Sequence, residues 1–274
     1  MNKLDTAKRT QIVAALVEGC SIRSTVRMTG ASKNTIAKLL VELGAACAEY
    51  LDKTLVDLIC KRIQADEIWQ YVGAKQKNVP AARQDELGIG DVWTWVAIDA
   101  DSKLICSWLV GKRDPACATA FIQDLAGRLA HRVQLTTDGL KMYLTAVADG
   151  FGEDIDYAQL VKVYGIADEG EKRYSPAVCT SCESHPITGN PDPKHINTSY
   201  IERQNLTMRM SMRRFTRLTN AFSKKLENHI AAIAIHLVYY NFVRIHQTLR
   251  ITPAMAAGVT HRLWSLEDLV NLLG

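Results

Sequence analysis

The chain has 274 residues, of which 47% are hydrophobic and 23% are charged, and its formal net charge is +4. These proportions are ordinary for a globular protein, and the mild positive charge alone is weak evidence for a nucleic-acid partner. No apolar run approaches the roughly 20 residues that cross a bilayer, and no secretory signal follows the first residues. We therefore expect a cytoplasmic protein with no membrane partner, whose seven cysteines are buried thiols and not disulfides.

The first 56 residues carry helical patterns only. Apolar residues recur at helical spacing over residues 12–17, and a short helix is predicted from residue 21 to residue 28. Gly30 stands where the end of a helix favours a positive φ, and Ser32 can cap a third helix. Three short helices with a tight turn before the third predict an all-α helix-turn-helix domain over residues 1–56.

The third predicted helix is the expected recognition helix, and Gly44 is expected to end it. Residues at the start of a recognition helix are the ones that reach the edges of DNA bases. Asn34 suits adenine, while Lys33 and Lys38 suit phosphate or guanine. A surface helix with ordinary polar residues is the alternative interpretation.

From residue 57 onward the pattern changes to the two-residue period of strands. Strands are predicted over residues 63–72, 92–98, 104–110, 133–137 and 158–164, with helices over residues 116–130 and 141–148. Three strands in a meander, followed by alternating helix and strand, are the order of a ribonuclease-H-like α/β domain. The predicted fold is therefore a ribonuclease-H-like mixed sheet with flanking helices, over residues 57–274, preceded by the helix-turn-helix domain.

Residues 165–197 are polar and rich in Pro, Gly, Ser and Asp, which favours a long loop. Helices are expected afterwards, over residues 199–218, 224–245 and 266–273. The loop contains Cys179 and Cys182 in a C-x-x-C pattern, followed by His185. Structural zinc normally has four ligands, and no fourth ligand is obvious here although His195 is possible, so zinc is not expected at this place.

Three carboxylates occupy positions that suit a metal site. Asp66 lies inside the first predicted strand, Asp138 ends the fourth, and Glu202 lies near the start of the helix after the loop. Phosphoryl transfer on DNA without a covalent enzyme intermediate uses a pair of Mg²⁺ ions roughly 3.5–4 Å apart, and Mg²⁺ takes oxygen ligands. Since neighbours on a strand point to opposite faces, Glu67 is expected to point away from this site.

Each carboxylate has an ordinary structural alternative. Asp138 can be a turn residue or a helix N-cap, and Glu202 can be a first-turn carboxylate that the helix dipole favours. Asp66 has fewer such explanations, because aspartate is disfavoured inside strands. The ordered set of three, each on a suitable element, favours the metal site.

Five stretches of the sequence occur in a characteristic order: DEIW, KLICSWLVGKRD, LTTDG, YIERQNLTMRMSMRRFTRLTNAFSK and YYNFVRIHQTLRITPAMAAG. Over residues 61–258 they make the chain resemble transposases of the bacterial insertion-sequence-one group. The last stretch is also similar to the closing segment of many integrases and transposases of the three-carboxylate (DDE) type.

The resemblance implies metal-dependent DNA cleavage and strand transfer at the ends of an insertion sequence. It places the catalytic and metal-binding carboxylates on Asp66, Asp138 and Glu202, with Mg²⁺ or Mn²⁺ as the cofactor. It further implies double-stranded DNA, both element ends and target, as the partner. A homodimer or higher oligomer on DNA, associated with the nucleoid, is expected.

The segment from residue 203 to residue 225 is basic and contains no acid. Its basic residues are Arg203, Arg209, Arg213, Arg214, Arg217, Lys224 and Lys225. On the predicted helix, Arg209, Arg213 and Arg217 share one face, which suits a row of DNA phosphates. The alternative is a solvated face, although its charges would repel one another without interspersed carboxylates.

Two other functions remain open at this stage. One is a helix-turn-helix regulator whose second domain only binds or dimerises, which has no need of a carboxylate inside a strand. The other is a ribonuclease-H-like nuclease that cleaves DNA without rejoining it.

Overall fold

The computed structural model describes residues 4–86, 88–165, 178–215 and 220–274. Its first three helices, α1 (Thr6–Val17), α2 (Ile22–Thr29) and α3 (Lys33–Thr54), each begin after a residue whose side chain caps them. Asp5, Ser21 and Ser32 accept hydrogen bonds from the backbone N–H three residues later, which satisfies amides that have no partner within the helix.

The turn between α2 and α3 has the predicted form, since Gly30 ends α2 with a φ of 70°. The prediction that Gly44 ends the third helix is wrong, because α3 continues as one helix of 22 residues. Gly44 lies against Ala231 of α7 (Leu226–Val238), and a Cβ at Gly44 would be 2.3 Å from the Cβ of Ala231. Glycine at this position therefore permits the close packing of two helices.

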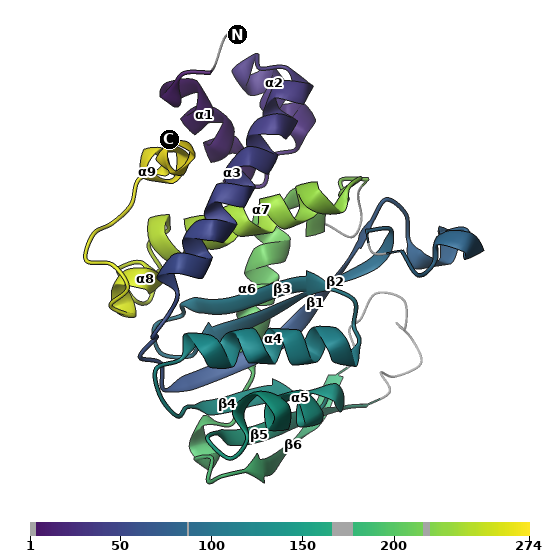
Figure 1. The fold of residues 1–274 in the computed structure, drawn as a ribbon, viewed down its shortest axis with the longest axis vertical. Helices are drawn as coiled ribbons and strands as arrows, with labels where there is room; N and C mark the ends of the chain where they lie inside the picture. Colours follow the sequence, from purple (N-terminus) through teal and green to yellow (C-terminus); the bar gives the residue numbers. More distant parts are fainter. Residues whose placement is uncertain (1–3, 87, 166–177, 216–219) are drawn as a thin grey trace.

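Figure 1 shows α3 descending from the first two helices to the sheet, with α7 crossing it. α1 packs against α9 (Leu266–Val270), so both ends of the chain lie in the same part of the molecule. The buried residues of these helices belong to the same hydrophobic cluster as those of the sheet. A domain boundary after residue 56 stays a prediction.

A six-stranded mixed sheet has the order β3-β2-β1-β4-β5-β6. Its strands are β1 (Arg62–Val72), β2 (Gly90–Asp99), β3 (Ile105–Gly111), β4 (Gln134–Asp138), β5 (Asp156–Gly165) and β6 (Val178–Thr188). The first three strands are antiparallel, β4 and β5 continue the sheet in parallel from β1, and β6 is antiparallel to β5. This topology confirms the predicted ribonuclease-H-like mixed sheet.

Helices flank the sheet as predicted. α4 (Pro115–Arg128) and α5 (Met142–Phe151) lie on one face, and α6 (Ser199–Ser211) lies on the other (Figure 1). α8 (Pro253–Ala256) follows a π-helical turn, Tyr239–Val243. Short 3₁₀ turns occupy Gln76–Asn78, Ala81–Arg83, Pro193–His195, Arg213–Phe215 and Asn271–Leu273.

The predicted long loop over residues 165–197 is wrong in part, because β6 lies within it. From Cys179 to Pro186 every side chain of β6 is exposed, so the segment has no alternation of apolar and polar residues. Its place in the sheet comes from backbone pairing with β5, which composition does not reveal.

One predicted helix also ends earlier than expected. α6 ends at Ser211, where the predicted helix continued to residue 218, whereas α7 continues directly into the π-helical turn Tyr239–Val243, close to the predicted end at residue 245. Met212 has the extended φ and ψ of −116° and 111°, with no Gly or Pro beside it to signal the break. In the part of the chain that the structure describes, no helix combines the length and the apolar character of a bilayer span.

Candidate active site

The centre of the sheet brings together carboxylates that are distant in sequence. β1 runs parallel to β4, with Ala65 opposite Thr137, so that the next residues, Asp66 and Asp138, are neighbours. Oxygen atoms of Asp66, Glu67 and Asp138 all lie within 4.8 Å of one another. Among the described residues, this is the one group of three or more His, Cys, Asp or Glu side chains that can hold a metal ion. We call these three residues the carboxylate cluster.

Asp66 is held in place from two directions. Its Oδ1 accepts a hydrogen bond from the backbone N–H of Glu67 at 2.8 Å, and its Oδ2 accepts one from Nδ2 of Asn205 on α6 at 2.9 Å. Burial, together with the negative charges of Glu67 and Asp138, raises the pKa of Asp66 to about 7. Without a cation, the clustered carboxylates thus favour a bound proton.

Glu67 does not point away from the cluster, so that prediction is wrong. Its side chain is only 1% exposed, and its Oε1 accepts a hydrogen bond from Nε of Arg113 at 2.7 Å. Its Oε2 accepts one from the hydroxyl of Tyr143 at 3.2 Å. Because β4 ends at Asp138, β1 has no strand partner on that side past this point, and a long side chain can bring its carboxylate close to that end.

The environment of Glu67 combines burial with a partly compensating cation. Burial raises the pKa of Glu67, the charge of Asp138 raises it further, and Arg113 opposes both effects. Burial also raises the pKa of Tyr143 far above its ordinary value, so this phenol stays protonated and donates to the glutamate. Glu67 is therefore a buried member of the cluster with two fixed partners.

Glu202 lies near the cluster but outside the group of three. It is in the first turn of α6, its side chain is 45% exposed, and it forms an ion pair with Lys162 of β5. Its Oε1 also accepts a hydrogen bond from the hydroxyl of Thr198 at 2.5 Å. Its negative charge contributes to the raised pKa of Asp66, as the smallest of the causes. Asn205, one turn later on the same helix, is the residue of α6 that contacts Asp66 directly.

The donor atoms of the cluster fit a hard divalent cation. Mg²⁺ and Mn²⁺ take carboxylate and amide oxygens as ligands, and Asp66 and Asp138 supply such oxygens from adjacent strands. The buried Oδ1 of Asn205 has no hydrogen-bond partner among the described residues and adds a further oxygen beside Asp66. A cation would also relieve the repulsion among the acids.

The predicted basic residues do not form a row on one helix. Because α6 ends at Ser211, Arg209 lies on that helix while Arg213 lies in the following 3₁₀ turn, so the predicted common face is wrong for this pair. Arg217 lies outside the described residues. Arg203, Arg213, Lys224 and Lys225 are exposed, whereas Arg209 and Arg214 are half-buried.

Arg214 forms hydrogen bonds with two neighbouring segments. Its Nη1 donates a hydrogen bond to Oγ of Ser223 at 2.9 Å, and its backbone oxygen accepts one from the side chain of Gln70. Burial lowers the pKa of Arg214 to about 10, which leaves the guanidinium charged at neutral pH.

The predicted base-reading residues lie at the start of α3. Lys33, Asn34 and Lys38 are all exposed there. Nζ of Lys38 is 3.7 Å from a carboxylate oxygen of Glu42 on the same helix. Lys33 and Asn34 are at the end of the helix that follows the Gly30 turn.

The C-x-x-C residues lie on β6, where both cysteines are exposed and their sulfur atoms are 3.7 Å apart. Nε2 of His185 is 3.6 Å from a carboxylate oxygen of Glu183. His195 is in contact with the guanidinium of Arg62, so its ring has a partner of its own.

Sequence reasoning did not identify several residues around the cluster, namely Arg113, Tyr143, Lys162 and Asn205. Asn205 is three residues after Glu202, a spacing that places both on one side of a helix, so a helical projection of α6 contained this signal. The positions of Arg113 and Tyr143 depend on how α4 and α5 pack, which no local pattern specifies.

No protein-family model matches the chain, and no curated protein matches it. Among solved structures, a piggyBac transposase synaptic complex with hairpin DNA aligns with 98% of this chain and 69% of its own, at 10% identity and a TM-score of 0.44. A Mos1 mariner paired-end complex with Mn aligns with 86% of this chain and 76% of its own, at 10% identity and a TM-score of 0.29. A pre-cleavage Mos1 transpososome aligns with 57% and 60%, at 13% identity and a TM-score of 0.25. The chain's own strand order and directions are those of a ribonuclease-H-like sheet.

Proposed function

We propose that this chain is a transposase of the three-carboxylate type, which cleaves DNA and transfers a strand at the ends of an insertion sequence. The observation that carries this proposal is the carboxylate cluster at the junction of β1 and β4, with Glu202 and Asn205 approaching from α6. The resemblance of residues 61–258 to insertion-sequence-one transposases supports the same reaction.

In this proposal, Asp66 and Asp138 hold divalent metal, Mg²⁺ or Mn²⁺, and Glu202 is the third ligand. Bound metal activates the attacking oxygen and stabilises the leaving oxygen of the phosphodiester. Asn205 keeps the Asp66 carboxylate oriented, and Arg113 and Tyr143 keep Glu67 in place beside it. Glu202 is paired with Lys162, and it would become a ligand by exchanging this ion pair for the metal.

DNA is the proposed partner of both parts of the chain. Lys33, Asn34 and Lys38 contact the element end as the recognition helix of a domain over residues 1–56. Exposed basic residues of the second domain, residues 57–274, contact phosphates without reading sequence, and these are Arg203, Arg213, Lys224 and Lys225. A homodimer or higher oligomer would bring two element ends together.

The test is a strand-transfer assay on DNA that carries the inverted repeats flanking the gene, with Mg²⁺ or Mn²⁺ supplied. We expect joined products from the unaltered protein and none from the Asp138→Asn protein. Asp149→Asn is the matched control, since Asp149 is an exposed aspartate of α5 outside the cluster. Cleavage without joining would identify a nuclease instead, and DNA binding without either reaction would identify a regulator.

A further inference from the structure

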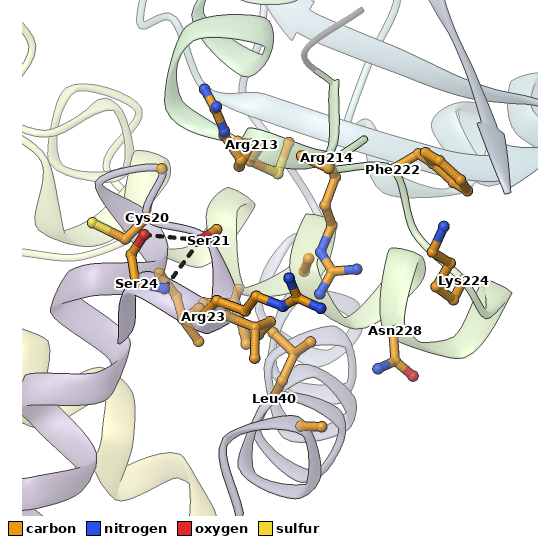
Figure 2. A pocket seen from close by; sticks show the side chains of 18 of the residues that line it. Cys20, Ser21, Arg23, Ser24, Leu40, Arg213, Arg214, Phe222, Lys224 and Asn228 are labelled. Carbon is orange, nitrogen blue, oxygen red and sulfur yellow. Dashed lines mark hydrogen bonds between the residues drawn. The ribbon is translucent and has the colours of Figure 1, made fainter. Parts of the chain in front are cut away.

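A second site lies between the N-terminal helices and the catalytic part of the chain. A cavity of about 920 Å³ is bounded by α2 and α3 on one side and by α7 and residues 212–214 and 220–225 on the other. Figure 2 shows Arg23 of α2 and Arg214 extending their guanidinium groups into the space between these elements. The volume is in the range of cavities that hold whole small molecules, far more than a single ion requires.

The charge of this cavity is entirely positive. Six basic residues line it: Arg23, Lys33, Arg213, Arg214, Lys224 and Lys225. No aspartate or glutamate is present among the described residues that form its wall. Cations gathered without acids repel one another, and an anion between them removes that repulsion, so the cavity is suited to a phosphate group.

The interior of the same cavity is apolar, unlike a simple anion site. Its wall includes Leu16, Ile22, Leu40 and Phe222. The Phe222 ring packs against Tyr71, with 4.6 Å between the ring centroids, and Nζ of Lys224 lies 3.3 Å from its centroid. A free inorganic phosphate or a peptide carboxylate would leave this apolar surface uncovered. A ligand that fills the cavity therefore joins an anionic group to a flat, partly apolar one.

His236 supplies an unused polar group in this wall. It is 1% exposed, and neither ring nitrogen has a hydrogen-bond partner among the described residues. A buried polar side chain without a partner costs free energy. Because both ring nitrogens of His236 are themselves buried, a ligand recovers this cost when the ring turns to bring a nitrogen to the cavity surface. Burial lowers the pKa of His236 to about 4, so its neutral ring offers one donor and one acceptor.

We propose that this cavity binds one nucleotide, with its phosphate between Arg23 and Arg214 and its base against His236 and over the Phe222 ring, in place of the Lys224 ammonium. The chemistry is the same for a free nucleotide and for an unpaired nucleotide within DNA. The DNA form rests on the proposed function, since a strand bound to both α3 and the sheet would pass this site. Base stacking on aromatic rings and cationic contacts with the backbone commonly act together in binding single strands.

The experiment measures binding in the absence of divalent metal, so that no DNA is cleaved. The probes are deoxyadenosine monophosphate, a duplex with one unpaired adenine, and the same duplex fully paired. Ala37→Trp fills the cavity from α3 without changing its charge. We expect it to weaken binding of the monophosphate, the unpaired duplex or both by about tenfold or more, as loss of a stacked base does, and to leave the paired duplex unchanged. Loss with the monophosphate identifies a free-nucleotide site, and loss with the unpaired duplex alone identifies a DNA site.

Matched variants separate this result from general damage to the fold. Ala45→Trp places the same side chain on an exposed position of α3 outside the cavity and should bind every probe normally. Arg23→Glu should weaken the same probes as Ala37→Trp, whereas Arg27→Glu, one turn along α2 and outside the cavity, should have an effect below twofold. His236→Phe should weaken binding while keeping the ring volume.

The inference is overturned if Ala37→Trp and the unaltered protein bind all three probes alike. It is also overturned if Arg23→Glu and Arg27→Glu reduce binding equally, because only net charge would then matter. Strand transfer is scored separately with metal. If the protein transfers strands but does not bind the nucleotide probes, the nucleotide site is wrong and the proposed function stands. If it binds the nucleotide probes but does not transfer strands, the proposed function is wrong and the nucleotide site stands.

Discussion

The carboxylate cluster and the basic residues beyond α6 differ in how the chain positions them. Asp66 and Asp138 lie on adjacent strands, where register fixes each residue against its neighbour. Arg213 and Lys224 lie outside the α-helices and the strands, one in a 3₁₀ turn and one before α7. Sites built on paired strands can thus be anticipated from the two-residue period and strand order, whereas sites on irregular segments depend on where a helix happens to end.

The largest expected effect tests the strand-borne site. Asp66→Asn keeps the shape of the side chain but removes a ligand charge, so strand transfer should fall by on the order of a thousandfold or more. The protein should still bind DNA through α3 with unchanged affinity, which a mobility-shift assay measures. Substantial strand transfer by this variant would show that the register of β1 and β4 does not define the active site.

A smaller loss is expected for the neighbouring acid. Glu67→Gln keeps the hydrogen bond from Tyr143 but removes the charge that Arg113 pairs with. We expect strand transfer to fall by about tenfold, with part of the activity retained, since Glu67 shapes the cluster through fixed partners. Activity equal to that of Asp66→Asn would instead make Glu67 an essential ligand.

The irregular segment is tested by its salt dependence. Replacing Arg213, Lys224 and Lys225 with Ala should lower the affinity for all DNA sequences by about tenfold at moderate salt. The slope of log affinity against log salt should fall by about 0.9 for each DNA phosphate that the altered protein no longer neutralises. If affinity falls for only one DNA sequence, these residues read bases, as is proposed for the start of α3, and do not contact phosphates alone.

A further effect concerns the stability of the fold, and not activity, in the absence of metal. Because the folded pKa of Asp66 is about 7 and its ordinary value is 3.8, the folded state holds this proton more tightly than the unfolded state. Stability should therefore decrease as the pH rises from about 4 to 7. Asp66→Asn should remove part of that decrease, about 1–3 kcal/mol, measured by urea unfolding at pH 5 and pH 8 in the presence of a chelator. An unchanged pH dependence would mean that Asp66 is not strained by its neighbours.

The parts of the molecule that sequence did not predict share a physical cause. Strands β1 to β5 are predicted from the two-residue period of their sequence and from the order of strands and helices, and this places Asp66 beside Asp138. Edge strand β6 was not predicted as a strand because its side chains are exposed and only its backbone joins the sheet. Gly44 was predicted to end a helix. Its role is instead to leave room for Ala231, a residue far from it in the chain.

The Glu67 prediction failed for a related reason. Alternation describes where a side chain leaves the backbone, but not where a long side chain ends. The early end of β4 and the partners on other elements, Arg113 and Tyr143, determine where the Glu67 carboxylate lies. Predicting it would have required the packing of α5 against the sheet.

The unbroken α3 helix also determines the distance between its two ends, one at the turn after α2 and one beside the sheet. A helix of 22 residues is about 33 Å long, which is close to one turn of B-form DNA. Because α3 packs closely against α7 at Gly44, the end of α3 that we propose reads DNA and the end beside the sheet are separated by a rigid spacer. Duplex DNA lying along this spacer would present the same groove face at both of its ends. The length of one helix would then fix how many base pairs separate the recognised sequence from the phosphodiester that reacts.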